Sequence, residues 1–307
     1  MSVRIAVLGD VLLDIDLVGR AGRLSPDAPV PVLEDLTEHP RPGGAALAAW
    51  LAAASAEVTL VAPLADDEEA RRLVELLAGR VTVLPLGYAG HTPVKQRLRA
   101  GGQTVARLDR GGEPATVGDL TRPAVNALSE ADAVLVSDYA RGVTSVPSIR
   151  WLLQTLPRRR PVVWDPHSRG APPVPGVHLV TPNEAEAAAW AGRIDPPVTG
   201  ADEGGCWARA ARAADALVQE WQAGAVAVTL GASGALLSHG PGAPVVVPAP
   251  PAPGLDSCGA GDAFAAAATT LLGAGELTDA AVGHAVTAAT AYVAAGGAAA
   301  VGTRDGG

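Results

Sequence analysis

The chain has 307 residues, of which 48% are apolar and only 3% aromatic, so Ala, Val and Leu must fill its interior. We expect one α/β domain spanning residues 1–307. The net charge of −9 argues against binding to a nucleic-acid backbone, so no nucleic acid is expected as a partner. Two isolated cysteines, Cys206 and Cys258, fit a reducing compartment, which predicts a cytoplasmic protein.

Short β-branched runs alternate with alanine-rich segments along most of the chain. This alternation predicts a mainly parallel sheet with helices on both faces. The expected strands are residues 4–8, 58–62, 133–137, 161–164, 177–180 and 225–229. Polar or turn residues follow several of them, at the edge where open α/β sheets bind ligands: Asp10, Asp138, Asp165, Asn183 and Gly231. Each of these residues, taken alone, is also explained as a helix cap.

Two segments, about 12–38 and 91–110, depart from this rhythm and predict a small inserted β-sheet that acts as a lid. In the first, Leu13, Ile15 and Leu17 alternate with Asp14 and Asp16, and the pattern continues through residues 28–32, which indicates exposed strands. The second contains two alternating runs around Gly101-Gly102, a two-residue hairpin turn.

The second lid segment carries a row of cations. Lys95, Arg97 and Arg99 are two residues apart and therefore share one strand face, which suits a phosphate on a substrate. A two-residue turn would place Arg107 on the opposite face. The alternative interpretation is a charged edge that prevents aggregation.

Residues 244–253 predict an edge strand and a connection, and residues 280–302 predict a buried helix followed by a glycine loop. The latter segment contains no Leu, Ile or Phe and is interrupted by Gly296 and Gly297. Because alanine contributes little to insertion, no membrane association is expected.

The segment Asp256-Ser-Cys-Gly-Ala-Gly-Asp262 places a glycine loop directly before an alanine-rich helix. Backbone N–H groups at such a helix start bind anions, and Gly259 and Gly261 allow close approach of a phosphoryl group. Asp262 in the first turn can accept the proton of an attacking hydroxyl. The alternative is an ordinary capping aspartate at a glycine turn.

Five segments in order resemble the ribokinase-like (PfkB-type) family of sugar kinases. They are GDVLLD at 9–14, PGGAA at 42–46, TPNEAE at 181–186, TLGASGA at 229–235 and DSCGAGDAF at 256–264. The resemblance implies a ribokinase-like fold, ATP-dependent phosphorylation of a sugar hydroxyl, Mg²⁺, and a lid that forms a homodimer. It also implies Asp262 as the general base and the amides of Gly259, Ala260 and Gly261 as an anion hole.

The same resemblance assigns the nucleotide side of the site. Its ATP-binding residues would be Asn183, Glu186, Thr229, Gly231 and Gly234, and Glu186 would hold Mg²⁺ through water. Asp256 and the loop around Gly302 would form a site for a monovalent cation such as K⁺.

On the sugar side, Asp14 can accept hydroxyl hydrogen bonds beside the glycine pair Gly43-Gly44. The segments LSPDAPVPV at 24–32 and SDYARG at 137–142, with the lid cations, most resemble the heptose 7-phosphate kinases. The predicted substrate-binding residues are therefore Asp14, Gly43, Gly44, Lys95, Arg97, Arg107 and Asp138.

Three positions depart from the family pattern: Leu47 stands where relatives usually have Asn, and His167 and Arg141 each replace a Lys. Loss of a polar partner lowers discrimination among sugars, so a kinase for another sugar, such as ribose or fructose, is an alternative. A second alternative is a non-catalytic sugar-binding regulatory protein with the same fold, although a sensor would not need Asp262.

Overall fold

A computed structural model describes residues 2–113, 115–156, 160–194, 205–252 and 257–301. Its main sheet has nine strands in the order β13-β12-β11-β10-β9-β8-β1-β4-β5. Neighbouring strands are parallel from β11 to β5, and the antiparallel β12 and β13 complete one edge. In chain order these strands are β1 (Arg4–Gly9), β4 (Glu57–Leu64), β5 (Thr82–Gly87), β8 (Ala133–Ser137), β9 (Val162–Asp165), β10 (Leu179–Val180), β11 (Val226–Thr229), β12 (Gly234–Ser238) and β13 (Val245–Pro248).

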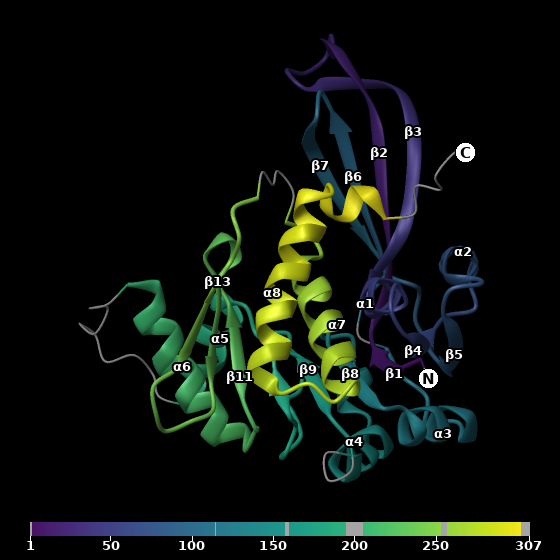
Figure 1. Cartoon of the computed structure of the whole chain (residues 1–307). Coiled ribbons are helices and arrows are strands. Elements are labelled where there is room, and N and C mark those ends of the chain that lie inside the picture. Colours follow the sequence, from purple (N-terminus) through teal and green to yellow (C-terminus); the bar gives the residue numbers. More distant parts are fainter. Residues whose placement is uncertain (1, 114, 157–159, 195–204, 253–256, 302–307) are drawn as a thin grey trace.

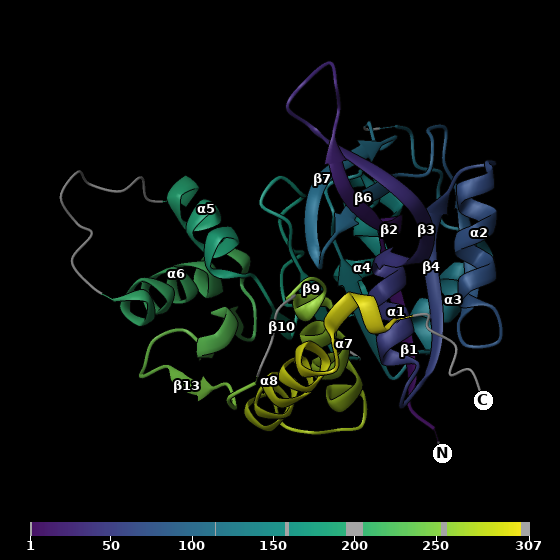
Figure 2. The ribbon, with the colours of Figure 1, turned by 90° about the horizontal axis from the view of Figure 1, so that it is seen from above.

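Helices cover both faces of the sheet (Figures 1 and 2). One face packs against α1 (Ala45–Ala52), α2 (Glu68–Leu77), α7 (Ala260–Gly273) and α8 (Thr278–Ala294). The other packs against α3 (Arg122–Glu130), α4 (Pro147–Thr155), α5 (Glu184–Ile194) and α6 (Cys206–Trp221). Short 3₁₀ turns are η1 (Val143–Ser145), η3 (Gly231–Ser233) and η4 (Gly297–Ala300). The α/β fold class predicted from the sequence is confirmed.

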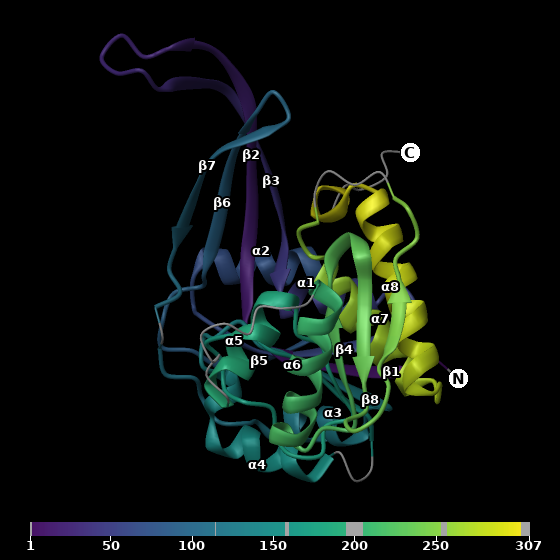
Figure 3. The ribbon, with the colours of Figure 1, turned by 90° about the vertical axis from the view of Figure 1, so that its left-hand side faces the viewer.

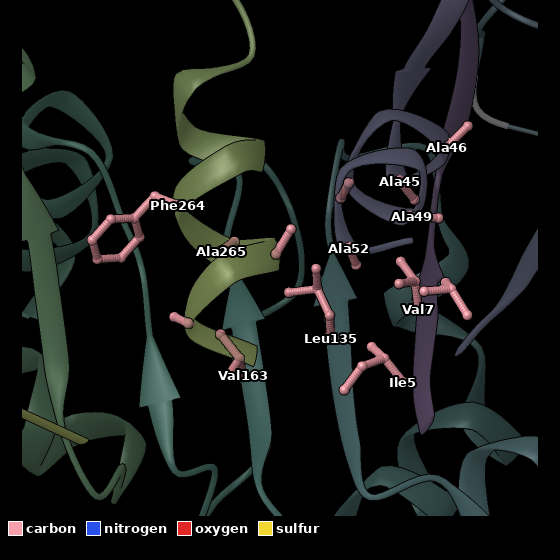
Figure 4. Close-up of a cluster of buried hydrophobic side chains, with 14 of the residues drawn as sticks. Ile5, Val7, Ala45, Ala46, Ala49, Ala52, Leu135, Val163, Phe264 and Ala265 are labelled. Carbon is pink, nitrogen blue, oxygen red and sulfur yellow. The ribbon is translucent and has the colours of Figure 1, made fainter. Parts of the chain in front are cut away.

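Strand β1 shows why this sequence forms a sheet between two helical layers. Ile5 and Val7 pack into the core beneath α1 and α7, whereas Ala6 and Leu8 pack into the opposite core. In Figure 4, alanines of α1 lie above Ile5 and Val7, and Ala265 of α7 lies on the side of Leu135 and Val163. Small helix side chains let the backbones approach the sheet closely, which accounts for the alanine-rich and aromatic-poor composition.

The lid is a separate four-stranded sheet in the order β3-β2-β6-β7. It comprises β2 (Val11–Leu24), β3 (Pro31–Gly44), β6 (Val94–Ala100) and β7 (Gln103–Arg110), and it projects from the body in Figure 3. The hairpin turn at Gly101-Gly102 is present, with φ of 59° and 78°. The expectation of exposed strands holds only for the outer part, because residues 11–16 are buried where the lid joins the body. The strand expected through residues 28–32 begins only at Pro31, after a turn closed by Ser25 N–H and the Val30 carbonyl.

A β-bulge corrects the prediction for Arg107. Ala100 pairs with Gln103 and Arg99 with Thr104, but Leu98 then pairs with Ala106 and Arg97 with Arg107. The extra residue, Val105, shifts the register by one and turns Arg107 onto the face of Arg97. The prediction that Arg107 points to the other face was wrong.

Two further expectations change. The strand expected at 177–180 is reduced to Leu179–Val180, because only these two residues join the ladder with β9. The helix expected to be buried within residues 280–302 buries only one stripe, formed by Ala281, Val282, Ala285 and Val286, because α8 is an outer helix packed on α7. The edge strand expected near 244–253 is β13. Among the described residues, no helix is long and apolar enough to span a membrane.

Candidate active site

The glycine loop after residue 256 forms the N-terminus of α7, as the sequence predicts. Gly259 is the N-cap with φ of 82°. A Cβ at this position would lie 2.5 Å from the Tyr292 hydroxyl and 2.8 Å from a methyl group of Leu47, so only glycine fits. Asp262 lies in the first helical turn and is 6% exposed. Asp256, with the loop around Gly302, lies outside the described residues.

A pocket of about 540 Å³ lies on one side of this helix start. Its walls come from the β11–η3–β12 turn, residues 249–252, the start of α7 and the C-terminal half of α8. They include the predicted residues Thr229, Gly231, Gly234, Ala260 and Gly261. Gly234 has φ of 103°, and a Cβ there would clash with the Val247 carbonyl oxygen. Small residues thus leave an apolar space beside a row of helix-start amides.

Asn183 and Glu186 form a reciprocal cap at the start of α5. The Asn183 N–H donates to the Glu186 carboxylate at 2.9 Å, and the Glu186 N–H donates to Asn183 Oδ1 at 2.9 Å. A β-bridge joins Asn183 to Thr229, which brings this pair to the edge of the pocket. Partial burial raises the pKa of Glu186. The three-residue spacing of Asn183 and Glu186 is therefore explained by helix capping, whether or not the two residues also bind a ligand.

Buried carboxylates gather near the start of α7. Burial raises the pKa of Asp262 to about 7, although a hydrogen bond from Tyr139 opposes the shift. The pKa of Asp165 is raised well above its usual value by burial and by the charges of Asp262 and Glu186. The Thr181 hydroxyl donates to Asp165 at 2.8 Å. Within the part of the chain that the structure describes, no three His, Cys, Asp or Glu side chains form a ready-made metal cage.

The lid brings Asp14 to the opposite side of the helix start. Asp14 is 6% exposed, and a Cβ at Gly43 would lie 2.6 Å from its Oδ2 atom, so the glycine makes room for this carboxylate. Gly44 has φ of 61° and lies against the ring of Tyr139. The predicted residues Asp14, Gly43 and Gly44 therefore lie together where the lid meets the body.

The predicted cations lie beside Asp14 on the same face of the lid. Arg97 donates to Asp14 at 2.9 Å and reaches the sulfur of Cys258, two residues before α7, at 3.3 Å. Arg99 donates to Asp16 at 3.2 Å, and Asp16 also forms a buried ion pair with Arg41 at 2.8 Å.

Lys95 and Arg107 extend this cationic face. The Lys95 ammonium lies 5.4 Å from the centroid of the Tyr139 ring, and burial lowers its pKa. Arg107 donates to Asp109 at 2.7 Å from Nε and remains half exposed. We therefore define the lid face as Asp14, Asp16, Arg41, Lys95, Arg97, Arg99, Arg107 and Asp109.

Asp138, a predicted sugar ligand, supports a loop in this structure. It is 3% exposed, and it accepts hydrogen bonds from the Ala140 N–H at 2.7 Å and the Thr144 hydroxyl at 2.9 Å. Burial raises its pKa to about 6. Through these hydrogen bonds, the Asp138 carboxylate stabilises the loop that follows β8, and this role does not require a bound sugar.

Sequence reasoning assigned no role in the site to Asp10, Tyr139 or Arg41. Asp10 was noted only as a strand-end residue, yet it accepts three backbone N–H bonds from the loop at 139–143. Tyr139 contacts Asp262, and its position next to the strand-end residue Asp138 was the available signal. Arg41 gave no sequence signal, because its partner Asp16 is reached only through the pairing of β2 with β3.

Comparison with known proteins places this geometry in context. Residues 3–304 match the sequence profile described as pfkB family carbohydrate kinase. The bifunctional protein HldE of Streptomyces coelicolor is 53% identical over 298 residues, which cover 97% of this chain and 61% of that protein. The D-beta-D-heptose 7-phosphate kinase of Bordetella bronchiseptica is 36% identical over 196 residues, covering 62% of each chain. The chain thus spans about three fifths of the length of these curated relatives.

Solved structures agree on the fold. The ribokinase of Thermotoga maritima superposes with a TM-score of 0.70 at 19% identity, covering 98% of this chain and 96% of that one. The Arabidopsis thaliana ribokinase complexed with ribose and ATP gives a TM-score of 0.67 at 19% identity, covering 95% and 93%. The ribokinase-like fold expected from the sequence motifs is confirmed.

Proposed function

The chain belongs to the pfkB family of carbohydrate kinases, and we propose that it transfers the γ-phosphoryl group of ATP to a hydroxyl of a sugar phosphate of the heptose 7-phosphate kind. The relatives named HldE and D-beta-D-heptose 7-phosphate kinase support this substrate class. The sequence motifs that resemble heptose 7-phosphate kinases lie within the segments shared with these relatives and point to the same class.

One observation carries the proposal: consecutive residues at the start of α7 serve the two sides of the site. Gly261 lines the 540 Å³ pocket, which we assign to the nucleotide. The next residue, Asp262, contacts Tyr139, which lies under Lys95 of the lid. A phosphoryl donor in the pocket and an acceptor under the lid would therefore meet at this turn, as transfer between two bound substrates requires.

In the proposed reaction, Asp262 accepts the proton of the sugar hydroxyl while the oxygen of that hydroxyl bonds to the γ-phosphorus of ATP. The bond from that phosphorus to the bridging oxygen breaks, and ADP leaves with the electron pair. A pKa of about 7 suits a general base at neutral pH, because the carboxylate is then both available and basic. The amides of Gly259, Ala260 and Gly261 would stabilise the charge on the transferred group.

Mg²⁺ is proposed as the cofactor, and its charge would neutralise the phosphate oxygens. The nearby donors fit it, because Asp165 and Glu186 offer oxygen only, and Mg²⁺ keeps several waters beside nucleotide phosphates. The mutual charge of Asp165, Glu186 and Asp262 is the kind of repulsion that a divalent cation relieves. The monovalent-cation site at Asp256 stays a prediction, because this residue lies outside those described; one relative of this fold has been solved in complex with potassium.

We assign the phosphate already present on the sugar to Lys95, Arg97 and Arg107. The bulge in β7 places Arg107 on their face, so three cations lie beside Asp14. A carboxylate for hydroxyl groups next to cations for a phosphate matches the two ends of a sugar phosphate.

We also propose a homodimer formed through the lid. Large apolar side chains are exposed on or beside its strands, among them Leu24 at 62%, Leu36 at 46% and Leu108 at 47%. Exposed apolar groups gathered on one projecting sheet are typical of an interaction surface. A molar mass twice that of the chain in light scattering would support the dimer, and a monomer would contradict it.

The test is release of ADP by the purified protein with ATP and Mg²⁺ across a panel of phosphorylated and unphosphorylated sugars. We expect turnover with at least one sugar phosphate and a loss of at least about 1,000-fold in the variant Asp262→Asn, since the base is removed. Arg71→Gln, which alters an exposed pair on α2, is the matched control.

Activity confined to unphosphorylated sugars would contradict the assigned phosphate site and favour a kinase for a sugar such as ribose or fructose. Sugar binding without ADP release from any member of the panel would favour the regulatory alternative.

A further inference from the structure

The hydroxyl of Tyr139 lies directly against the carboxylate of Asp262. Its oxygen is 2.9 Å from Oδ1 and 3.0 Å from Oδ2, so the phenol faces both oxygens almost symmetrically. A phenol has one proton to donate, and a carboxylate has about four acceptor positions. The contact therefore leaves room on Asp262 for a second donor, such as a sugar hydroxyl.

The loop that carries Tyr139 is held by a buried carboxylate. Asp10, 1% exposed, accepts from the backbone N–H groups of Tyr139 at 3.1 Å, Arg141 at 2.9 Å and Val143 at 3.3 Å. Between them, Ala140 adopts a φ of 56°, which side-chain-bearing residues rarely occupy. Such a backbone persists only where its surroundings fix it, so the position of Tyr139 is determined by the fold rather than by the contact with Asp262 alone.

The ring of Tyr139 also lies against both Gly44 and Lys95. The nearest ring carbons lie 3.5 and 3.6 Å from the position of a Cβ on Gly44, and the Lys95 ammonium lies 5.4 Å from the ring centroid. The side chain thus connects the lid, the glycine pair and the start of α7. A residue in this place can orient Asp262 only when all three parts are assembled.

Charged groups from several elements act on Asp262 together with the phenol. The charge of Asp14 on β2 disfavours its ionised form, whereas Lys95 of β6 favours it. The charge of Asp262 in turn raises the pKa of Asp165 at the end of β9. The charge of Cys258, two residues before α7, raises the pKa of the Tyr139 phenol. Burial and the charge of Asp262 raise the pKa of Tyr139 well above its usual value, so the phenol stays protonated and serves only as a donor.

We propose that Tyr139 is a positioning residue for the general base: its hydroxyl orients the Asp262 carboxylate toward the sugar hydroxyl and stabilises the ionised, proton-accepting form. This role rests on the proposed kinase function. It adds a residue outside the glycine loop to the machinery of proton transfer. Without the phenol, Asp262 would hold its proton to higher pH and would lose one fixed orientation.

The test is the pH dependence of kcat/KM for Tyr139→Phe, which keeps the ring beside Gly44 and Lys95 and removes only the hydroxyl. We expect the acidic limb of the profile to move upward by about one pH unit, since a hydrogen bond to a charged group is lost. We expect kcat at pH 7 to fall about tenfold while the KM for the sugar changes less than about threefold. Tyr88→Phe, whose hydroxyl donates to the Glu113 carbonyl at 3.2 Å, is the matched control and should keep the wild-type profile.

An acidic limb that coincides with that of the wild type would overturn the proposal, as would a change confined to the KM. Should Tyr139→Phe fold poorly, replacing Tyr139 with 3-fluorotyrosine, whose side chain has nearly the same size, gives a second test. Its phenol is a stronger donor, so the acidic limb should move downward, and an unchanged limb would again overturn the role.

A measurement without turnover separates this proposal from the kinase function. In protein labelled with ¹³C at the Asp carboxyl carbons, the Asp262 signal is the one lost in Asp262→Asn, and its titration reports the pKa directly. If no sugar releases ADP, the proposed function fails, and this titration alone decides the contact. An upward shift in Tyr139→Phe supports the interaction with the carboxylate, and an unchanged titration overturns it.

Discussion

The two sides of the α7 helix start are built from opposite kinds of surface. The nucleotide pocket is lined mainly by small residues from turns and helices, including Gly231, Ala260 and Ala289. The lid face carries five arginine and lysine side chains against three aspartates, several of them buried. Under the proposed function, the nucleotide would be recognised by shape and backbone amides, and the sugar phosphate by charge.

The same contrast concerns what holds each side in place. On the nucleotide side, a Cβ at Gly234 would meet backbone atoms of β13 and residue 249, so this turn is fixed by steric fit. On the lid face, Asp16 is held by Arg41, and Arg97 is shared between Asp14 and Cys258. Buried ion pairs cost desolvation and are sensitive to the loss of one partner. The lid face should therefore respond most strongly to single changes of charge.

Among the changes that compare the two sides, the largest effect is expected from breaking the lid face at Arg97. In Arg97→Gln the KM for the sugar phosphate should rise about 100-fold, because a charge-assisted hydrogen-bond donor is lost. The KM for ATP should change less than about twofold, because Arg97 does not line the nucleotide pocket. Steady-state kinetics with each substrate varied in turn measures both values. Equal increases in the two KM values would contradict the separation of the two sides.

A smaller effect is expected from filling the nucleotide pocket. Ala289→Phe on α8 adds a ring to its wall and should raise the KM for ATP about tenfold while leaving the KM for the sugar unchanged. Ala280→Phe, on an exposed position of the same helix, is the control for the added ring. An unchanged ATP affinity in Ala289→Phe would show that ATP binds elsewhere.

The smallest effect concerns stability where the two sides meet. The pKa of Asp262 is about 7 in the folded protein, against 3.8 for an aspartate exposed in the unfolded chain, so the unfolded chain loses this proton first as the pH rises. The stability of the wild type therefore decreases between about pH 4 and pH 7 on account of this group. Asp262→Asn lacks that loss, and its melting temperature should exceed that of the wild type by a few degrees more at pH 8 than at pH 5. A difference independent of pH, measured by circular dichroism, would contradict the raised pKa.

The periodic parts of the chain could be predicted from the sequence. Runs such as Ala133–Ser137 became strands with the predicted bounds, because a buried parallel strand needs only continuous apolar residues. The glycine loop before Asp262 was also predictable, since a left-handed N-cap at Gly259 and a close approach to Tyr292 both require glycine.

The site was predictable to the extent that local motifs specify it. Asp14 and Gly43 lie side by side, and Gly231 and Gly234 line the pocket beside the glycine loop, while their roles in binding stay predictions. The contact between Tyr139 and Asp262 was not predictable, because 123 residues separate the two and no periodicity relates them. The structural task of Asp138 was hidden for the same reason, since its partners depend on the conformation of the following loop.

The sequence alone thus determined the family, the glycine loop and the strands of the main sheet other than β5 and β12, because each depends on neighbouring residues and their spacing. The tertiary structure alone decided which charges face one another. One unpaired residue at Val105 placed Arg107 beside Arg97, and strand pairing joined Arg41 to Asp16. The side chain period of a strand is two, so a register shift of a single residue reverses a face, and only the paired sheet fixes that register.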